Sequence, residues 1–184
     1  MRLRRAQPLI NLDCKVLTLS SAALEGAGLG AAATTNADGR RAWILTPTEA
    51  SGLRQQFKTN SAASWLGNPS VASIATYGGV QARVVVGNAG AAVGVSRTDV
   101  TIDLIPKLVS SSVKLTIGAT AIESPGSSRN SQSGRTNFTL ACQAIVPNGG
   151  SLLVEGAPLK DGGENRYWLM VSPRVWNPAD KPTQ

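Results

Sequence analysis

Side chains that could do acid–base or nucleophilic chemistry are few in this sequence of 184 residues, and histidine is absent. The chain therefore lacks the commonest general base and the commonest metal ligand. Asp99 and Asp103 stand four residues apart on an alternating segment and should point to solvent, while Glu155 and Asp161 are expected at turns. None of these positions indicates the burial that shifts a carboxyl pKa for catalysis. We therefore predict that the chain is not an enzyme and has no catalytic residue.

The two cysteines, Cys14 and Cys142, stand far apart and form no C-x-x-C pair. A zinc or redox site is not indicated by this spacing. The cysteines could face each other on neighbouring strands as a disulfide, or they could be two buried small hydrophobes, and we favour the second interpretation. The sequence thus predicts no cofactor and no metal.

The formal net charge is +7 and the pI is about 10, which raises nucleic acid or anionic lipid as a partner. The cations are scattered, apart from Arg2, Arg4 and Arg5 at the start and the pair Arg40–Arg41. Only 4% of the residues are aromatic, so few side chains could stack on bases. We do not expect nucleic-acid binding.

No stretch approaches the ~20 apolar residues of a transmembrane helix. Asn11, Asp13 and Lys15 interrupt the segment after the first arginines, so the N-terminus is not expected to be a signal peptide. The protein is then either intracellular or a piece of a longer precursor. We expect one domain over residues 1–176 and a disordered tail over 177–184.

Alternating apolar and polar residues predict strands along most of the chain. They cover Leu9–Leu19, Trp43–Leu45, Trp65–Ala75 with a kink at Asn68–Pro69, Gln81–Val86, Asp99–Pro106, Val113–Thr120 and a last strand through Tyr167 and Val171 closed by Pro173. A helical turn is expected over 22–25, and a longer helix over 47–58. That helix should start at Thr46 with proline next and Glu49 three residues on. Residues 123–134 are expected to form a polar, mobile loop.

The segment from Arg135 to Gly156 contains Pro147-Asn148-Gly149-Gly150, whose residues suit a tight turn between two antiparallel strands. Tyr77-Gly78-Gly79-Val80 is a second such turn, after which Gln81–Val86 should pair back. The predicted fold is mainly β with one or two short helices, arranged as an antiparallel meander that forms a curled sheet or part of a barrel.

The order of these pieces resembles the C-terminal pore-forming domain of secretins, the outer-membrane ring proteins of type II secretion and type IV pilus systems. The resemblance covers nearly everything from Leu9 to Val175. It rests on the hairpin Asn68–Gly87, the strands Asp99–Pro106 and Val113–Ile117, the segment Arg135–Gly156 and the closing Trp168-Leu169-Met170-Val171-Ser172-Pro173. The matching family positions are Pro69, Gly79, Gly87, Pro106, Arg135, Gly149, Gly156 and Pro173.

Two family segments are absent. Only about a dozen small residues fill the interval in which secretins carry the gate insertion, and Ala157–Gly163 replaces the segment V-P-x-L-G-x-I-P-x-L-G-x-L-F. The resemblance implies a homo-oligomeric ring in the outer membrane or periplasm that serves protein secretion or pilus export, with contacts to other secretion components and to the membrane. Asp103 and Lys114 would then face the lumen. The alternative is a structural or adhesive β protein, of a virion or surface layer, that keeps the fold without a pore.

Overall fold

The computed structural model describes residues 7–26, 28–29, 34–35, 39–59, 64–65, 72–87, 97–124, 135–158 and 165–176. Several predicted features lie outside these ranges: Asp161, Pro69 and its kink, residues 125–134 of the polar loop, and the tail 177–184. In the part that is described, no helix is both long enough and apolar enough to cross a membrane.

The described chain is mainly β and antiparallel with two helices, which confirms the predicted fold class. In chain order, its elements are β1 (Leu9–Ser20), α1 (Ser21–Glu25), β2 (Thr34–Thr35), β3 (Arg41–Leu45), α2 (Pro47–Thr59), β4 (Ser64–Trp65), β5 (Ala72–Tyr77), β6 (Ala82–Gly87), β7 (Arg97–Val109), β8 (Ser112–Ser124), β9 (Arg135–Pro147), β10 (Ser151–Pro158) and β11 (Asn165–Trp176).

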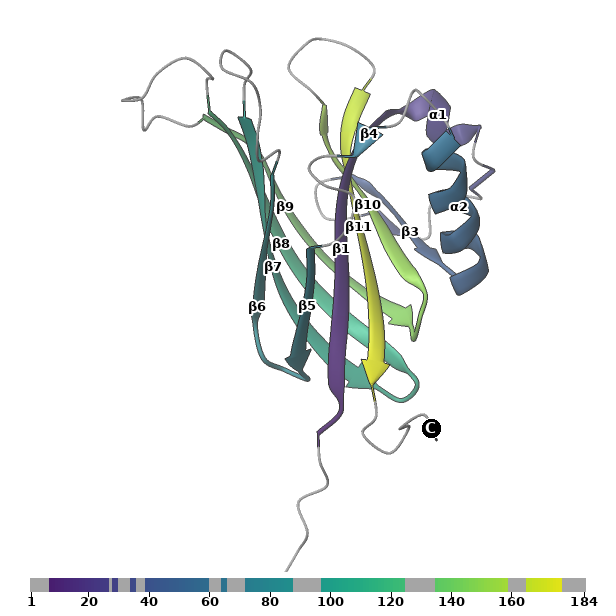
Figure 1. The fold of residues 1–184 in the computed structure, drawn as a ribbon, viewed down its shortest axis with the longest axis vertical. Helices are drawn as coiled ribbons and strands as arrows, with labels where there is room; N and C mark the ends of the chain where they lie inside the picture. The colour runs from purple at the N-terminus through teal and green to yellow at the C-terminus, as the bar shows by residue number, and fades with distance from the viewer. Residues whose placement is uncertain are drawn as a thin grey trace, which may run out of the picture.

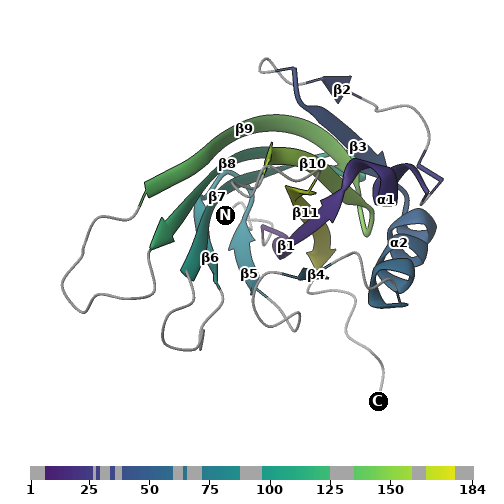
Figure 2. The same ribbon diagram turned by 90° about the horizontal axis from the view of Figure 1, so that it is seen from above.

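The strands form two sheets. Sheet A has the order β2-β3-β10-β11-β1, and both β4 and β5 pair with the remaining edge of β1. Sheet B is the meander β6-β7-β8-β9. Figure 2 shows sheet B as a curved layer that arches over sheet A, while α1 and α2 lie on the opposite side of sheet A.

The main core lies between the two sheets. Every second residue of the long strands points into it, as with Ile10, Leu12 and Cys14 on β1, because successive side chains of a strand point to opposite faces. The cluster takes residues from both sheets, including Ile102, Leu104, Leu115 and Ile117 of sheet B. In sheet B the strands are buried on one face only, as the alternation in the sequence predicts, whereas β10 and β11 of sheet A are buried on both faces.

A second, smaller core lies between sheet A and α2. The helix contributes Ala50, Leu53 and Phe57 at helical spacing, and these pack with Trp43 and Trp168 of the sheet. The predicted start of α2 is confirmed: Glu49 accepts hydrogen bonds from the backbone N–H and hydroxyl of Thr46, and the Thr46 hydroxyl accepts one from the Glu49 N–H. Ser20 caps α1 in the same way, accepting from Ala23.

The two predicted hairpins are corrected in one respect. Both turns form, but each joins the two sheets instead of closing a ladder. β5 pairs with β1 in sheet A and β6 with β7 in sheet B, while β9 pairs with β8 and β10 with β3 and β11. Alternation predicts the buried face of a strand but not its neighbour, because a ladder can form with any strand of suitable face.

Two strands continue past the prolines that were expected to end them. β7 runs through Pro106 to Val109, and β11 runs through Pro173 to Trp176. Strand β8 likewise extends through Glu123 and Ser124, which were assigned to the mobile loop. A proline lacks only its own backbone N–H. The strand can therefore still pair with its neighbour on the side opposite to the one that this N–H would face.

Candidate functional site

The outward face of sheet B carries the residues that were predicted to face a lumen. It carries the residues that alternate with the buried ones, and few of them are charged. One row across the sheet is formed by Val85, Thr101, Thr120 and Thr139, which stand opposite one another on four adjacent strands. Neighbouring strands lie about 4.8 Å apart, so the three threonines form a continuous hydroxyl row.

Asp103 and Lys114, the residues predicted to face a lumen, both lie on this outward face. Asp103 forms a bidentate ion pair with Arg83 on the neighbouring strand, with N···O distances of 2.8 and 3.1 Å, and also accepts a hydrogen bond from Gln81. These hydrogen bonds, chiefly the one from Arg83, hold the pKa of Asp103 below its usual range. Lys114 lies directly opposite Lys107 of β7. The two like charges repel each other at this pair.

Strands β6 and β9 are the outermost strands of sheet B, and among the described residues each has a ladder partner on one side only. The direction of their backbone groups follows from the Gly79 N–H, which donates to the Pro106 carbonyl across 2.6 Å. Because the N–H and C=O of a strand residue point to the same side and alternate, Leu104 and Ile102 also point toward β6. Their partners Ala82 and Val84 must point back toward β7.

The same alternation leaves Arg83, Val85 and Gly87 with backbone groups directed to the free edge of β6. The register of β7 with β8 and of β8 with β9 extends this alternation to β9. There, the backbone groups of Ala141, Gln143 and Ile145 point to the free edge. One contact agrees with this assignment: Arg40 donates from its Nη1 to the carbonyl of Thr139, 2.8 Å away, on that edge. Among the described residues, sheet B therefore has two open edges without a ladder partner, one of them partly capped by Arg40.

The positions that were matched to the secretin pattern by resemblance are mostly structural. Gly79 and Gly149 have φ of +83° and +79°, which L side chains rarely adopt, and occupy the two turns between the sheets. Pro106 and Pro173 lie within buried strand positions. Gly149 donates to the carbonyl of Pro173 across 3.0 Å, as Gly79 does to Pro106. The side on which each proline lacks an N–H thus faces a turn, and it does not face the strand that pairs with the proline.

Gly156 and Gly87 lie where strands come close. A Cβ on Gly156 would stand 2.7 Å from the carbonyl oxygen of Tyr167, at the point where the β10–β11 register shifts. A Cβ on Gly87 would collide with the carboxylate of Asp99. Arg135 begins β9 opposite Glu123.

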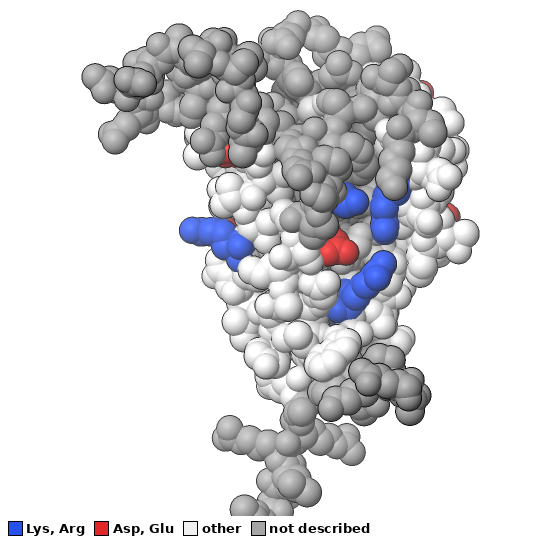
Figure 3. Space-filling view, in the orientation of Figure 1, with Lys and Arg blue, Asp and Glu red and all other residues white. Residues whose placement is uncertain are grey.

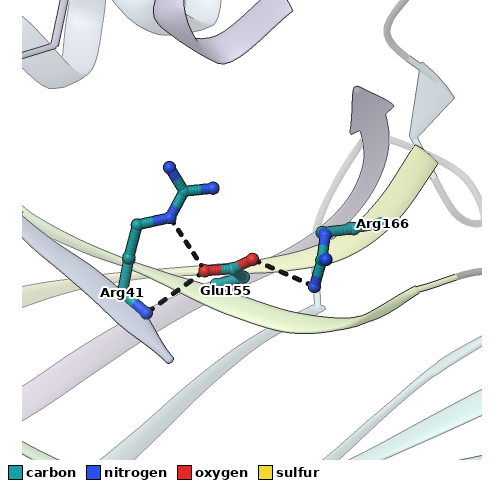
Figure 4. Close-up of polar contacts among 3 residues, drawn as sticks. All are labelled: Arg41, Glu155 and Arg166. Atoms are coloured by element: carbon teal, nitrogen blue, oxygen red, sulfur yellow. Dashed lines mark hydrogen bonds and ion pairs between the residues drawn. The ribbon is translucent and has the colours of Figure 1, made fainter. Parts of the chain in front are cut away.

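The structure brings together one charged cluster that sequence reasoning missed. Glu155 was expected at a turn, but it lies in β10, only 6% exposed. One oxygen of its carboxylate accepts from the Nε and backbone N–H of Arg41, at 3.0 and 3.2 Å, and the other pairs with Arg166 at 3.1 Å (Figure 4). Burial by itself would raise the pKa of Glu155, but the hydrogen bonds from Arg41 and the two positive charges outweigh it and lower the pKa.

The Arg41 guanidinium also lies over two aromatic rings, 5.5 Å from the centroid of Trp43 and 5.9 Å from that of Trp168. The Glu155 carboxylate is thus held by two arginines beside a tryptophan pair. The two ion pairs of Glu155 thus link β10 to β3 through Arg41 and to β11 through Arg166. A signal for it did exist in the sequence, because Glu155 follows Leu153 with strand spacing.

In the described ranges, no group of three or more acidic or sulfur side chains is placed to hold a metal ion. Cys14 and Cys142 are both buried and are not joined in a disulfide, which confirms the interpretation of two small hydrophobes. Burial, with a smaller effect of the Asp13 charge, raises the pKa of the Cys14 thiol to about 12. No known family model and no curated protein matches this chain.

Proposed function

We propose that this chain is the wall subunit of a homo-oligomeric ring in the outer envelope, similar to a secretin, that serves protein secretion or pilus export. The observation that carries the proposal is sheet B, a four-stranded meander with open edges on β6 and β9. Unpaired edges are normally covered, charged or paired with another chain.

The even number of strands favours closure of a ring. Because β6 and β9 run in opposite directions, β9 of one copy placed beside β6 of the next continues the antiparallel alternation. Repeating one head-to-tail contact by rotation generates a closed ring and leaves no edge exposed. In such a wall, the outward face with Asp103, Lys114 and the threonine row would line a wet lumen.

A complementation experiment tests this contact. Val85→Pro removes a backbone N–H from the open edge of β6, and Gln143→Pro removes one from the open edge of β9. Neither N–H is used within sheet B, so both variants should keep the fold. We expect the wild-type chain to give rings by negative-stain electron microscopy and each variant to elute as a monomer near 19.0 kDa.

The mixture of the two variants is decisive. Each retains the edge that the other has lost, so together they should form a 1:1 heterodimer and nothing larger. Val85→Thr and Gln143→Thr are the matched controls, since they keep the N–H and should assemble as the wild type does. A wild-type chain that stays monomeric in mild detergent, with a normal circular dichroism spectrum, would reject the ring.

A structural or adhesive β protein without a pore is the second candidate, and one contact favours it. Arg40 occupies the Thr139 carbonyl on the edge of β9, which is a way of closing an edge within one molecule. Under this alternative, Arg40→Ala opens the edge and creates oligomers that the wild type lacks. Under the ring proposal, wild-type rings are present before the substitution.

A further inference from the structure

One end of the molecule collects the tight turns of both sheets. Leu9 stands between Trp176 and Tyr77 in sheet A. The β5–β6 turn is bonded to β7 through Gly79, and the β9–β10 turn is bonded to β11 through Gly149. The β5–β6, β7–β8 and β9–β10 turns, the start of β1 and the end of β11 thus lie together, at the lower end of Figure 1. We call this the turn end, made of residues 7–10, 77–81, 105–114, 145–150 and 173–176.

Large apolar side chains are exposed at the turn end, where a monomer would ordinarily have polar turns. Tyr77 and Val80 are each 50% exposed and Trp176 is 49% exposed, and Leu108 and Val109 beside them are also exposed. Tryptophan and tyrosine favour the boundary between water and lipid, because one part of each side chain is apolar and another forms hydrogen bonds.

The charges of the turn end all have one sign. Lys107, Lys114 and Arg174 lie within it, and its residues include no aspartate or glutamate. Neither Lys107 nor Arg174 has an ion-pair partner among the described residues. The nearest acid along β7 is Asp103, which is already paired with Arg83. In the view of Figure 3, the lower part of the described surface is mostly white and shows no red.

We propose that the turn end docks on an anionic lipid surface. Its exposed apolar side chains enter the headgroup boundary, while Lys107 and Arg174 contact lipid phosphates. These apolar residues are Tyr77, Val80, Leu108, Val109 and Trp176. Juxtamembrane lysine and arginine bind anionic leaflets, and exposed apolar tips add to that binding by burial. Lys107 and Arg174 lie on different sheets, so positive charge flanks the apolar tip on both sides. None of the side chains proposed to contact lipid belongs to a residue whose backbone groups form an open edge of sheet B, so this proposal does not depend on ring assembly.

The test is cosedimentation of the chain with vesicles of phosphatidylcholine, with or without about one third phosphatidylglycerol. We expect binding to the anionic vesicles only. The double variant Lys107→Gln/Arg174→Gln should bind roughly 25-fold more weakly, about fivefold for each cation. The charge-preserving Lys107→Arg/Arg174→Lys should bind as the wild type does.

A second set of variants, with its own control, tests the apolar side chains of the turn end. Val80→Ser/Val109→Ser should weaken binding roughly tenfold. Val85→Ser, which changes a more exposed valine on the outward face of sheet B, should not weaken it. Lipids brominated on their acyl chains should quench tryptophan fluorescence, and Trp176→Phe should abolish most of that quenching while binding persists.

Three results would overturn the proposal. One is equal binding to both kinds of vesicle. Another is anionic binding that Lys107→Gln/Arg174→Gln leaves unchanged, since the net charge of the chain would then suffice. The third is a lipid-free dimer that Val80→Ser/Val109→Ser dissociates, because the turn end would then be an interface between copies of this chain.

Discussion

Gly149 donates its backbone N–H to the carbonyl of Pro173 across 3.0 Å, and in doing so lets a proline remain inside a strand. The same relationship joins Gly79 to Pro106 at the other turn between the sheets. In both cases, a glycine of positive φ satisfies the proline carbonyl from the side on which the proline has no N–H to offer. The same glycine-to-proline hydrogen bond thus occurs at both turns that join the two sheets.

Substitution of these turn glycines should cost stability through backbone strain alone. No atom lies within 4 Å of a Cβ built on Gly79, and only the Cγ of Pro47 approaches one on Gly149. Gly79→Ala and Gly149→Ala should each lower the free energy of unfolding by about 1 kcal/mol, the cost of a left-handed conformation. Urea denaturation measures this loss. Gly118→Ala is the control, because Gly118 has ordinary φ and equal space, and it should be close to neutral.

Gly156→Ala should be more damaging, since its Cβ would stand 2.7 Å from the Tyr167 carbonyl oxygen and 3.2 Å from the carbonyl carbon. Backbone cannot move aside as a flexible side chain can, so β10 and β11 must separate at their bulge. We expect a loss of about 2 kcal/mol or more, read from the same urea curves. A Gly156→Ala variant as stable as Gly118→Ala would show that the two strands can separate there without cost.

Acid should weaken the fold through Glu155. Its pKa in the folded protein is lowered, so the unfolded chain, with a pKa near 4.5, takes up a proton first as the pH falls. The stabilisation is complete above about pH 4.5 and is lost as the pH drops through the folded pKa. In Glu155→Gln, the dependence of unfolding free energy on pH should be shallower below pH 4.5, although the variant starts less stable at pH 7. If Glu155→Gln and the wild type lose unfolding free energy equally steeply below pH 4.5, Glu155 is not the group responsible.

Alkali should weaken the fold through Cys14. Because the folded pKa is raised to about 12 while the unfolded thiol titrates near 9.0, the unfolded chain loses its proton first. The stabilisation is present below pH 9 and disappears as the pH rises toward 12. Thermal melts of Cys14→Ala should show a shallower alkaline decline than the wild type. In the folded wild type at pH 8, Cys14 should also resist alkylation by iodoacetamide, and rapid labelling would contradict its burial.

Local features of the fold followed from the sequence because their causes are local. The alternation of Ile10, Leu12 and Cys14 fixes a strand and its buried face, since the period of side chains in a strand is two. Thr46 and Glu49 define the start of α2 because both partners of that cap lie within one turn. Glycines 79 and 149 define turns because only glycine adopts positive φ without strain.

What the tertiary structure alone decided is which segments meet. The first strand pairs with the last over twelve residues, from Leu9 opposite Trp176 to Ser20 opposite Asn165, and no local pattern encodes that choice. Glu155 meets Arg41 across 114 positions of sequence and becomes a buried, doubly paired carboxylate, whereas its neighbours suggested a turn. The alternation of apolar and polar residues specifies the buried face of a strand, and local residue preferences specify turns. The partner of a strand, however, is selected by the burial of both sheets together. That selection is a property of the whole chain.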